Sequence, residues 1–397
     1  MRSLDEHLAL VLALVSRGRA ETVQLADALG RVVAEDHLAI GASPAFDNSA
    51  MDGYAVRASD LALAQPARPV SLMVVGESRA GAAPEAAVSA GSAVRIMTGA
   101  PLPAGADSVV AQEVVDREGT SVRFAAPTPL GAHVRRAGED VRPGDVVIPA
   151  GTVLGPRHLA AAAASGLAEL HVVAVPRVGY LITGDELIEP GRALGPGQIH
   201  DSNGTYLSAA LVALGALPVT LGRVGDDPAQ VLAAIRGAEV DLVVTTGGAS
   251  VGDHDPVKAA LANIGVDFVP VAMQPGKPQG AGRINGTPVV CLPGNPVAVA
   301  VCVELFVGAA VRAMLGVAEP SWIPAPVAAS WRCPPGREQL MPVVVDDLSG
   351  AVRPATAGGS GSHLAGRLAT ATALARVATD VTAVEPGDTV LVRRFTA

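Results

Sequence analysis

Apolar and polar residues follow patterns that change character along the chain, and each change marks a predicted domain. The first segment, 1–41, carries apolar side chains at helical spacing, namely Leu4, Leu8, Leu12 and Val15. Because positions three or four apart share one face of a helix, this spacing predicts an amphipathic helix. The helical period stops at Gly41–Pro44, where glycine and proline indicate a turn.

Residues 42–138 show no long helical period and carry short strand-like runs, such as Val70–Val75 and Val94–Met97. Clusters of proline and glycine separate the runs, which is typical of a small β-rich domain. Residues 139–175 then combine a P-G-D turn with an alanine-rich helical stretch. We expect 139–175 to pack with 1–41 as one discontinuous helical linker domain.

Strands and helices alternate regularly over residues 176–318. Several helix starts carry a capping residue, either directly before a proline, at Asp227, Asp255 and Asn295, or within D-S-N, at Ser202 or Asn203. This alternation predicts a central, doubly wound, mostly parallel α/β domain with helices on both faces of the sheet. From 319 to 397, prolines and short strand-like runs predict a small C-terminal β-barrel, so the chain is expected to be a multidomain α/β plus β protein.

Composition narrows the classes of function. Of 397 residues, 49% are hydrophobic and 17% are charged, which is typical of a globular rather than a disordered chain. The net charge is −9 and no run of Lys and Arg is visible, which argues against nucleic acid or an anionic membrane surface as the main partner. With Trp 2, Tyr 3 and Phe 5, base stacking on aromatic platforms is not a main theme either.

The cysteines Cys291, Cys302 and Cys333 form no C-x-x-C pair, and three cysteines cannot all pair within one chain. We interpret them as reduced thiols of a cytoplasmic protein. The N-terminal apolar stretch follows Asp5 and Glu6 and has no small-residue cleavage site, so we interpret it as a helix rather than a signal sequence. We expect no segment long and apolar enough to span a membrane.

Four short motifs that follow strand-like runs carry most of the candidate chemistry. They read T-G-D-E at Thr183–Glu186, T-T-G-G at Thr245–Gly248, P-G-K-P at Pro275–Pro278 and P-G-N-P at Pro293–Pro296. In a doubly wound sheet, ligands bind beyond the carboxyl ends of the strands. Glycines let the backbone approach a ligand closely and helix N-termini favour anions, so the pattern predicts a phosphorylated or otherwise anionic ligand.

Acids in these loops are candidate ligands of Mg²⁺, which usually takes one or two carboxylates together with phosphates and water. Asp185 and Glu186 directly follow a strand, and the alternative is a capped loop with solvated acids. Asp227 and Asp255 precede prolines, where helix capping is a sufficient explanation; capping is favoured for Asp227, whereas the glycine-rich loop before Asp255 favours function. His254 is interpreted as a loop histidine, and the chain has no multi-histidine motif that would indicate structural zinc.

Lys277 lies between two prolines in P-G-K-P. The prolines restrict the backbone, and a lysine held in such a turn is suited to contact phosphate as a point charge. The alternative is a solvated turn lysine.

The N-terminal half holds three further motifs, F-D-N-S-A-M-D-G-Y-A at Phe46–Ala55, R-I-M-T-G-A-P-L-P at Arg95–Pro103 and R-R-A-G-E-D at Arg135–Asp140. Taken singly, each is also compatible with turn chemistry. Their combination of acids, cations and hydroxyl groups beside glycines is nevertheless unusual for generic loops.

Together these motifs resemble the MoeA-type molybdopterin molybdenumtransferases, the last enzymes of molybdenum cofactor synthesis. The matching strings are FDNSAMDGYAVR, RIMTGAPLPAGAD, RRAGEDV, TGDEL, DSN, TTGGASVGDHD, PGKP and LPGNP, in the family's order between residues 46 and 296. The sequence departs from the family at Gln274, where many relatives carry a basic residue, and at Gln279–Gly282, where the usual aromatic-containing segment is replaced.

The resemblance implies that adenylylated molybdopterin and molybdate react with Mg²⁺ present, giving molybdenum cofactor and AMP. It implies catalytic roles for Asp52, Thr98, Asp140, Glu186 and Asp255. It implies Mg²⁺ ligation by Glu186, by Asp227 or its neighbour Asp226, and by Asp255. It also implies substrate contacts by Arg135, Lys277 and Ser362, to which the glycine-rich loops add Thr183, Gly184, Gly247, Gly248, Ser250, Gly294 and Asn295.

The resemblance further implies an elongated homodimer of four-domain chains. Each site would lie between the α/β domain of one subunit and the N-terminal β-rich domain of the other. Molybdopterin adenylyltransferase and molybdoenzyme maturation proteins are candidate partners.

Two alternative functions remain open. The first is a molybdopterin adenylyltransferase, whose fold the α/β domain resembles. The second is a non-catalytic pterin-binding or scaffold protein, because fused relatives also serve interaction roles. The motifs around Asp52, Thr98 and Asp140 argue against the first alternative, and the retained acids argue against the second.

Overall fold

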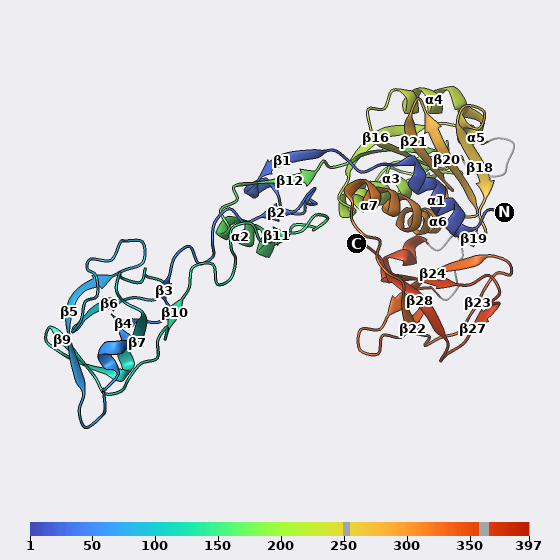
Figure 1. The fold of residues 1–397 in the computed structure, drawn as a ribbon. Helices are drawn as coiled ribbons and strands as arrows, with labels where there is room; N and C mark the ends of the chain where they lie inside the picture. Colours follow the sequence, from blue (N-terminus) through green and yellow to red (C-terminus); the bar gives the residue numbers. More distant parts are fainter. Residues whose placement is uncertain (249–254, 357–364, 397) are drawn as a thin grey trace.

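The computed structural model describes residues 1–248, 255–356 and 365–396 and shows an elongated chain made of successive bodies (Figure 1). A β-rich body lies at one end and a small linker body lies in the middle. An α/β body and a C-terminal β body lie side by side at the other end.

The α/β body is built on a six-stranded sheet. Its strand order is β16 (Leu217–Val224), β13 (Arg177–Thr183), β17 (Leu242–Thr246), β21 (Thr287–Leu292), β20 (Pro278–Ile284) and β18 (Val266–Pro270). The first four strands are mutually parallel, whereas β20 pairs antiparallel with β21, and β18 pairs antiparallel with β20. The prediction of a mostly parallel, doubly wound sheet is confirmed.

Helices cover both faces of this sheet because the β-branched strands are apolar on both sides. One face carries α3 (Ser202–Ala213) and a long helix made of α6 (Pro296–Cys302), the π-helical turn η4 (Val303–Val307) and α7 (Gly308–Leu315). The other face carries α4 (Pro228–Arg236) and α5 (Pro256–Leu261). Neighbouring residues of β13 accordingly belong to different core clusters. Ile182 packs with Leu207 and Leu211 of α3 on one face. Leu181 packs with Val231 and Ile235 of α4 on the other face.

The N-terminal helix α1 (Leu4–Leu14) packs on the α/β body, not in the linker body with residues 139–175 as the sequence pattern had suggested (Figure 1). Ser3 caps the helix, and its side-chain oxygen accepts a hydrogen bond from the Glu6 N–H. The buried side chains of Leu4 and Val11 share a core cluster with the sheet and with α7. Periodicity identified the apolar face of this helix correctly but carries no information about which body covers it.

By length and composition alone, the helix Pro296–Leu315 could cross a membrane, which contradicts the expectation that no segment is apolar enough. However, 94% of the 18-residue window that meets this test is buried inside the protein. Its charged residues Glu304 and Arg312 are buried too, and Arg312 donates to the Glu304 carbonyl oxygen at 3.2 Å. The segment is therefore the central helix of the α/β core.

The linker body contains more strand than the sequence predicted. It pairs β1 (Ala20–Gln24) with β12 (Glu169–Val173), and β2 (His37–Leu38) with β11 (Val146–Ile148), beside α2 (Pro156–Ala164). The five residues of β1 alternate between exposed and half-buried, as expected of a strand. This short strand was not predicted from the sequence, because it directly follows a segment with helical spacing. The segments on either side of this body lead to the α/β body, and Val32 and Val173 of the linker body also pack against the core of the α/β body (Figure 1).

The distal β-rich body is a six-stranded sheet. Its order is β7 (Ser108–Ala111), β4 (Gly53–Val56), β6 (Ser92–Ile96), β5 (Val70–Ser78), β9 (Ser121–Phe124) and β8 (Val115–Glu118). A separate pair, β3 (Asn48–Ser49) with β10 (Val134–Arg135), lies where this body meets the linker (Figure 1).

The C-terminal body is a closed β structure. Its strands are β22 (Ile323–Pro326), β24 (Glu338–Val345), β25 (Val352–Pro354), β26 (Ala373–Val377) and β28 (Thr389–Arg394), with the short pair β23 (Trp331–Arg332) and β27 (Ala383–Val384). A bridge between Val327 and Val352 links the end of β22 to β25 and closes the ring. The short strand β19 (Met273–Gln274) of the α/β body pairs with β24, and this pairing joins the two bodies.

His7 of α1 provides a test of how this helix is anchored. The imidazole is fully buried edge-on against Phe306, with ring centroids 4.9 Å apart. Burial, assisted by the positive charge of Arg2 and opposed by Asp267, lowers the pKa of His7 from 6.5 to about 4. The unfolded chain therefore binds the proton more readily, so the stabilisation is complete above pH 6.5 and is lost as the pH falls toward 4.

We predict that the parent protein loses roughly 1–2 kcal/mol more stability than His7→Leu between pH 7 and pH 5. Thermal unfolding of both proteins at the two pH values measures the difference. Identical pH dependence in the two proteins would show that His7 is not buried in its neutral form.

Candidate functional site

The carboxyl ends of the parallel strands bring the predicted loops together along one edge of the sheet, the edge at which these strands end. Ile182 of β13 pairs with Thr246 of β17, and Thr246 pairs in turn with Leu292 of β21. The loops that start at Thr183, Gly247 and Pro293 are therefore neighbours. The antiparallel strand β20 begins at this same edge, since Gly280 pairs with Cys291, and this places the exposed Lys277 just beyond the edge.

Close backbone packing explains the glycines in these loops. Gly247 has φ +83°, and a Cβ there would lie 2.5 Å from the carbonyl oxygen of Thr183. A Cβ on Gly294 would lie 3.1 Å from the Cα of Gly247. The three loops thus stack on each other with no room for side chains, so that backbone groups of Thr183, Gly247 and Gly294 form one surface.

Asp255 stands at this surface and also caps a helix. Its carboxylate accepts a hydrogen bond from the Lys258 N–H at 3.3 Å at the start of α5. It is 7% exposed, and its Oδ1 lies 3.1 Å from where a Cβ of Gly248 would be. The capping explanation is therefore correct, and the cap holds the carboxylate beside the T-T-G-G loop.

A second group of acids flanks β13 at the same edge. Burial, followed by the negative charges of Asp185 and Glu186, raises the pKa of Asp226. Glu186 folds back on its own loop, because a Cβ on Gly184 would lie 2.5 Å from Glu186 Oε2. Asp185, Glu186 and Asp226 thus concentrate negative charge, which a divalent cation would relieve.

Asp227 is used differently from its neighbour. Its carboxylate accepts from the Ala229 N–H at 2.9 Å and from the Gln230 side chain at 3.0 Å, as the cap of α4. These hydrogen bonds lower the pKa of Asp227. Of these two neighbours, Asp227 is therefore engaged as a helix cap, and Asp226 lies with the acids of the T-G-D-E loop. No three His, Cys, Asp or Glu side chains within the described ranges are close enough to form a complete metal site on their own.

The start of α3 ties the first and last loops together. Asp201, rather than Ser202 or Asn203, caps this helix by accepting from the Gly204 N–H at 2.9 Å. Asn203 instead donates from Nδ2 to the carbonyl oxygen of Gly294 at 2.8 Å. The D-S-N string therefore contributes a cap and a loop clamp, two roles that its composition alone did not separate.

A cavity of about 360 Å³ adjoins these loops, between the α/β body and the C-terminal body. Its walls include Asn203, Tyr206 and Pro296 on one side, and Phe395 and the short helix η5 (Ala365–Thr370) on the other. Burial, followed by the charge of Glu304, raises the pKa of the Tyr206 hydroxyl. Sequence reasoning missed Tyr206 and Phe395 because each is an isolated aromatic outside any motif.

The N-terminal motifs form a separate group in the β-rich body. Asp52, in the turn before β4, accepts from the backbone N–H of Thr98 at 2.7 Å and from its hydroxyl at 2.8 Å. These two bonds, together with the positive charge of Arg95, lower the pKa of Asp52. Gly99 N–H donates to the Ser49 carbonyl oxygen at 2.8 Å, which fixes this loop against β3.

The two arginines of R-R-A-G-E-D have different environments. Arg136 forms an ion pair with Asp47 at 2.6 Å. Arg135 pairs through its backbone with Asn48 and has an exposed side chain, with no ion pair in the part of the chain that the structure describes. Asp140 is exposed as well, and its N–H donates to the Ser43 carbonyl oxygen at 3.0 Å. Arg135 and Asp140 are thus the charged groups of the motif that are open to a ligand.

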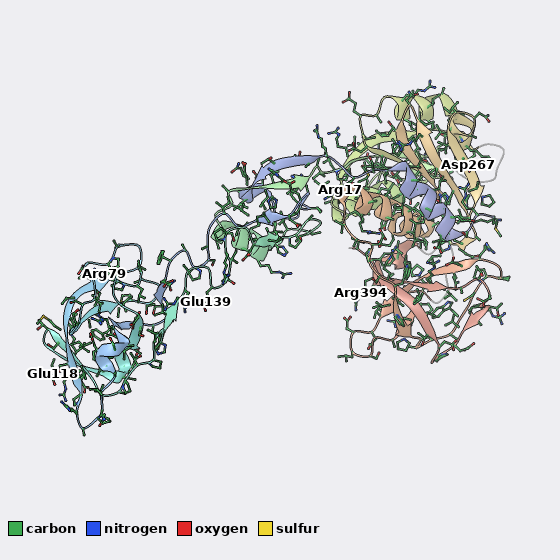
Figure 2. The ribbon with its side chains drawn as sticks, in the orientation of Figure 1. Arg17, Arg79, Glu118, Glu139, Asp267 and Arg394 are labelled. Carbon is green, nitrogen blue, oxygen red and sulfur yellow. The ribbon has the colours of Figure 1, made fainter. Side chains whose placement is uncertain are left out.

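The two groups lie in bodies at opposite ends of the chain (Figure 1). Glu139, beside Asp140, is labelled near the distal body, far from the α/β body, in Figure 2. Within one chain, the fold brings together Thr183, Glu186, Asp255, Lys277 and the loop glycines, but not Asp52, Thr98 or Arg135. Ser250 and Ser362 lie outside the described residues.

Known families match almost the whole chain. The family models are the MoeA N-terminal region (domain I and II) at residues 2–166, the probable molybdopterin binding domain at 179–313, and the MoeA C-terminal region (domain IV) at 324–395. Molybdopterin molybdenumtransferase 2 of Mycobacterium tuberculosis is 42% identical over 98% of both chains. The molybdopterin molybdenumtransferase of Haemophilus influenzae is 42% identical over 70% of this chain and 69% of its own. The crystal structure of the molybdopterin biosynthesis MoeA protein from Pyrococcus horikosii, 32% identical, covers 99% of this chain and 98% of that chain with a TM-score of 0.88.

The different uses of Asp226 and Asp227 can be separated by experiment. Asp227→Ala removes the cap of α4, and amide hydrogens of its first turn should exchange roughly fivefold faster, from the usual size of a cap effect. Asp227→Asn keeps a capping oxygen and should exchange nearly as the parent does. Equal protection in all three proteins would mean that Asp227 is not the cap and is free to hold a cation.

Proposed function

The chain belongs to the MoeA family of molybdopterin molybdenumtransferases, and we propose that it inserts molybdate into adenylylated molybdopterin with Mg²⁺-dependent release of AMP. It is accordingly a transferase of molybdenum cofactor biosynthesis. The observation that carries the detailed proposal is the stacking of the T-G-D-E, T-T-G-G and P-G-N-P loops at one edge of the sheet. Backbone groups in such loops, beside the N-terminus of α6, suit the phosphates of the pterin substrate.

Mg²⁺ fits the acids at this edge. Burial, followed by the negative charges of Asp185 and Glu186, raises the pKa of Asp226, and the capped Asp255 adds a carboxylate beside the neighbouring loop. When bound, the ion would neutralise the pyrophosphate and polarise it for cleavage. Glu186 and Asp226 would hold the ion together with phosphate oxygens of the substrate, Asp255 would face the same phosphates from the neighbouring loop, and Asp227 would act as a helix cap.

The other side chains act by positioning and charge. Lys277 projects from a turn between two prolines and would attract an anionic group, either phosphate or molybdate. The pterin phosphate would be bound by the strand-end loops, through Thr183, Gly184, Gly247, Gly248 and Asn295. Gly294 would contribute as well, from the loop that Asn203 holds in place by a hydrogen bond. The dithiolene of the substrate supplies sulfur ligands for molybdenum, which is consistent with three cysteines that are all buried thiols.

We propose that the functional site is completed by a second copy of the chain. Asp52 and Thr98 lie in the distal body, and the linker body separates this body from the strand-end loops of the same chain (Figure 1). In a twofold dimer each distal body can meet the α/β body of its partner, and both sites are then equivalent. Asp52, Thr98, Arg135 and Asp140 would then approach the strand-end loops from across the interface.

Other partners follow from the reaction. An enzyme that uses adenylylated molybdopterin needs a molybdopterin adenylyltransferase to supply it, and its product must pass to proteins that mature molybdoenzymes. The three buried free thiols suit the reducing cytoplasm, where we place the protein.

The assay for this function uses purified protein with adenylylated molybdopterin, molybdate and Mg²⁺. Molybdate-stimulated release of AMP supports the transferase. Consumption of ATP with unadenylated molybdopterin would instead indicate an adenylyltransferase. Binding without turnover would indicate a scaffold.

In the same assay, we predict that Glu186→Gln and Asp226→Asn each slow AMP release roughly tenfold to a hundredfold, because each removes charge aimed at the pyrophosphate. Glu189→Gln is a matched control, since Glu189 is exposed in the same loop region. Raising the Mg²⁺ concentration should partly restore the rate of the first two variants. A variant that keeps the full Mg²⁺-dependent rate would remove its residue from the ion site.

A further inference from the structure

A second cavity lies at the junction between the α/β body and the linker body. Its volume is about 470 Å³. The chain passes this junction twice, on leaving α1 through residues 14–19 and on returning to β13 through residues 174–177, and both passages line the cavity. Arg17, labelled in Figure 2, marks the place.

Positive charge dominates this junction cavity. Four arginines line it, Arg17, Arg19, Arg177 and Arg283, against one carboxylate, Asp241. Asp241 accepts a hydrogen bond from the backbone N–H of Arg177 at 2.7 Å. Such an excess of cations stands out in a chain whose net charge is −9.

Carbonyl groups orient these arginines without neutralising them. Arg17 donates to the Ala34 carbonyl oxygen at 2.8 Å, Arg177 to that of Glu239 at 3.1 Å, and Arg283 to those of Leu14 and, at 2.7 Å, Gly286. The side chain of Arg19 makes no hydrogen bond within the described residues. None of the four takes part in a salt bridge there, whereas Arg376 and Arg393 elsewhere do.

We infer that the junction cavity binds a small molecule carrying a diphosphate group. Guanidinium groups bind phosphate oxygens in a fork, and several of them around one cavity favour a multiply charged anion over a single carboxylate. The volume is within the range of small-ligand sites. Apolar side chains of Leu14, Pro176 and Met314 form part of the wall and suit the organic part of such a ligand.

The ligand would bridge two bodies. Arg17 and Arg19 belong to the segment that enters the linker body, whereas Arg177 and Arg283 belong to strands of the α/β body. Phosphates held by both sets tie the two passages of the chain to the sheet. This site is distinct from the strand-end loops and does not depend on the proposed transferase reaction.

The test is calorimetric titration of the full-length protein with inorganic pyrophosphate in the presence of EDTA, which suppresses metal-dependent binding at the strand-end loops. We expect binding that weakens with added salt. Arg19→Ala and Arg177→Ala should each weaken binding about fivefold or more, because each removes one charge near the anion. Arg157→Ala, which removes an exposed arginine of α2 that does not line the cavity, should bind like the parent.

Asp241→Asn is expected to gain affinity, a result that a misfolded variant cannot give, and it therefore serves as a second test. Among the described residues that line the cavity, Asp241 carries the only carboxylate, and asparagine keeps an oxygen for the Arg177 N–H, so pyrophosphate should bind about threefold more tightly. Absence of binding by the parent protein, or unchanged affinity in both arginine variants, would overturn the proposal. A loss in only one of them would contradict the bridge. Changed sedimentation of Arg19→Ala with unchanged affinity would assign the arginines to contacts with a second copy instead.

Discussion

The parallel pairing of β13, β17 and β21 is the constraint on which the candidate site depends. Because the three strands run in one direction and in register, their carboxyl ends meet at one edge of the sheet. The T-G-D-E, T-T-G-G and P-G-N-P loops begin there, and helices α5 and α6 start there with capped N-termini. The same geometry that buries the strands on both faces therefore concentrates backbone N–H groups and acids at one place.

Chain connectivity determines what this edge lacks. The chain leaves the α/β body after α1, builds the linker and the distal β-rich body, and returns only at β13. Asp52 and Thr98 are therefore remote from the acids of the α/β body (Figure 1). Two hydrogen bonds nevertheless hold these two residues to each other. This separation of the two groups is the basis of our proposal that a second copy of the chain completes each site.

Local patterns predicted the strand-end loops well. A β-branched run favours a strand, and a following glycine, or a capping residue before a proline, restricts the backbone conformations that can come next. Asp227, Asp255 and Asn295 all cap helices as their sequence context indicates. What local patterns could not supply was tertiary placement. The packing of α1 on the α/β body, the proximity of Asp226 to Asp185 and Glu186, and the gathering of Arg17, Arg19, Arg177 and Arg283 each depend on contacts between residues far apart in sequence.

The central claim, a site shared between two chains, is tested most directly by complementation. Asp52→Asn and Asp255→Asn chains, each nearly inactive alone, are dissociated together, allowed to re-form dimers, and assayed for AMP release. Random pairing makes about half the dimers mixed, and a mixed dimer has one intact site, so about a quarter of all sites should regain activity. If verified mixed dimers release no more AMP than the separate variants, the two residues do not act across the interface, and the account is contradicted.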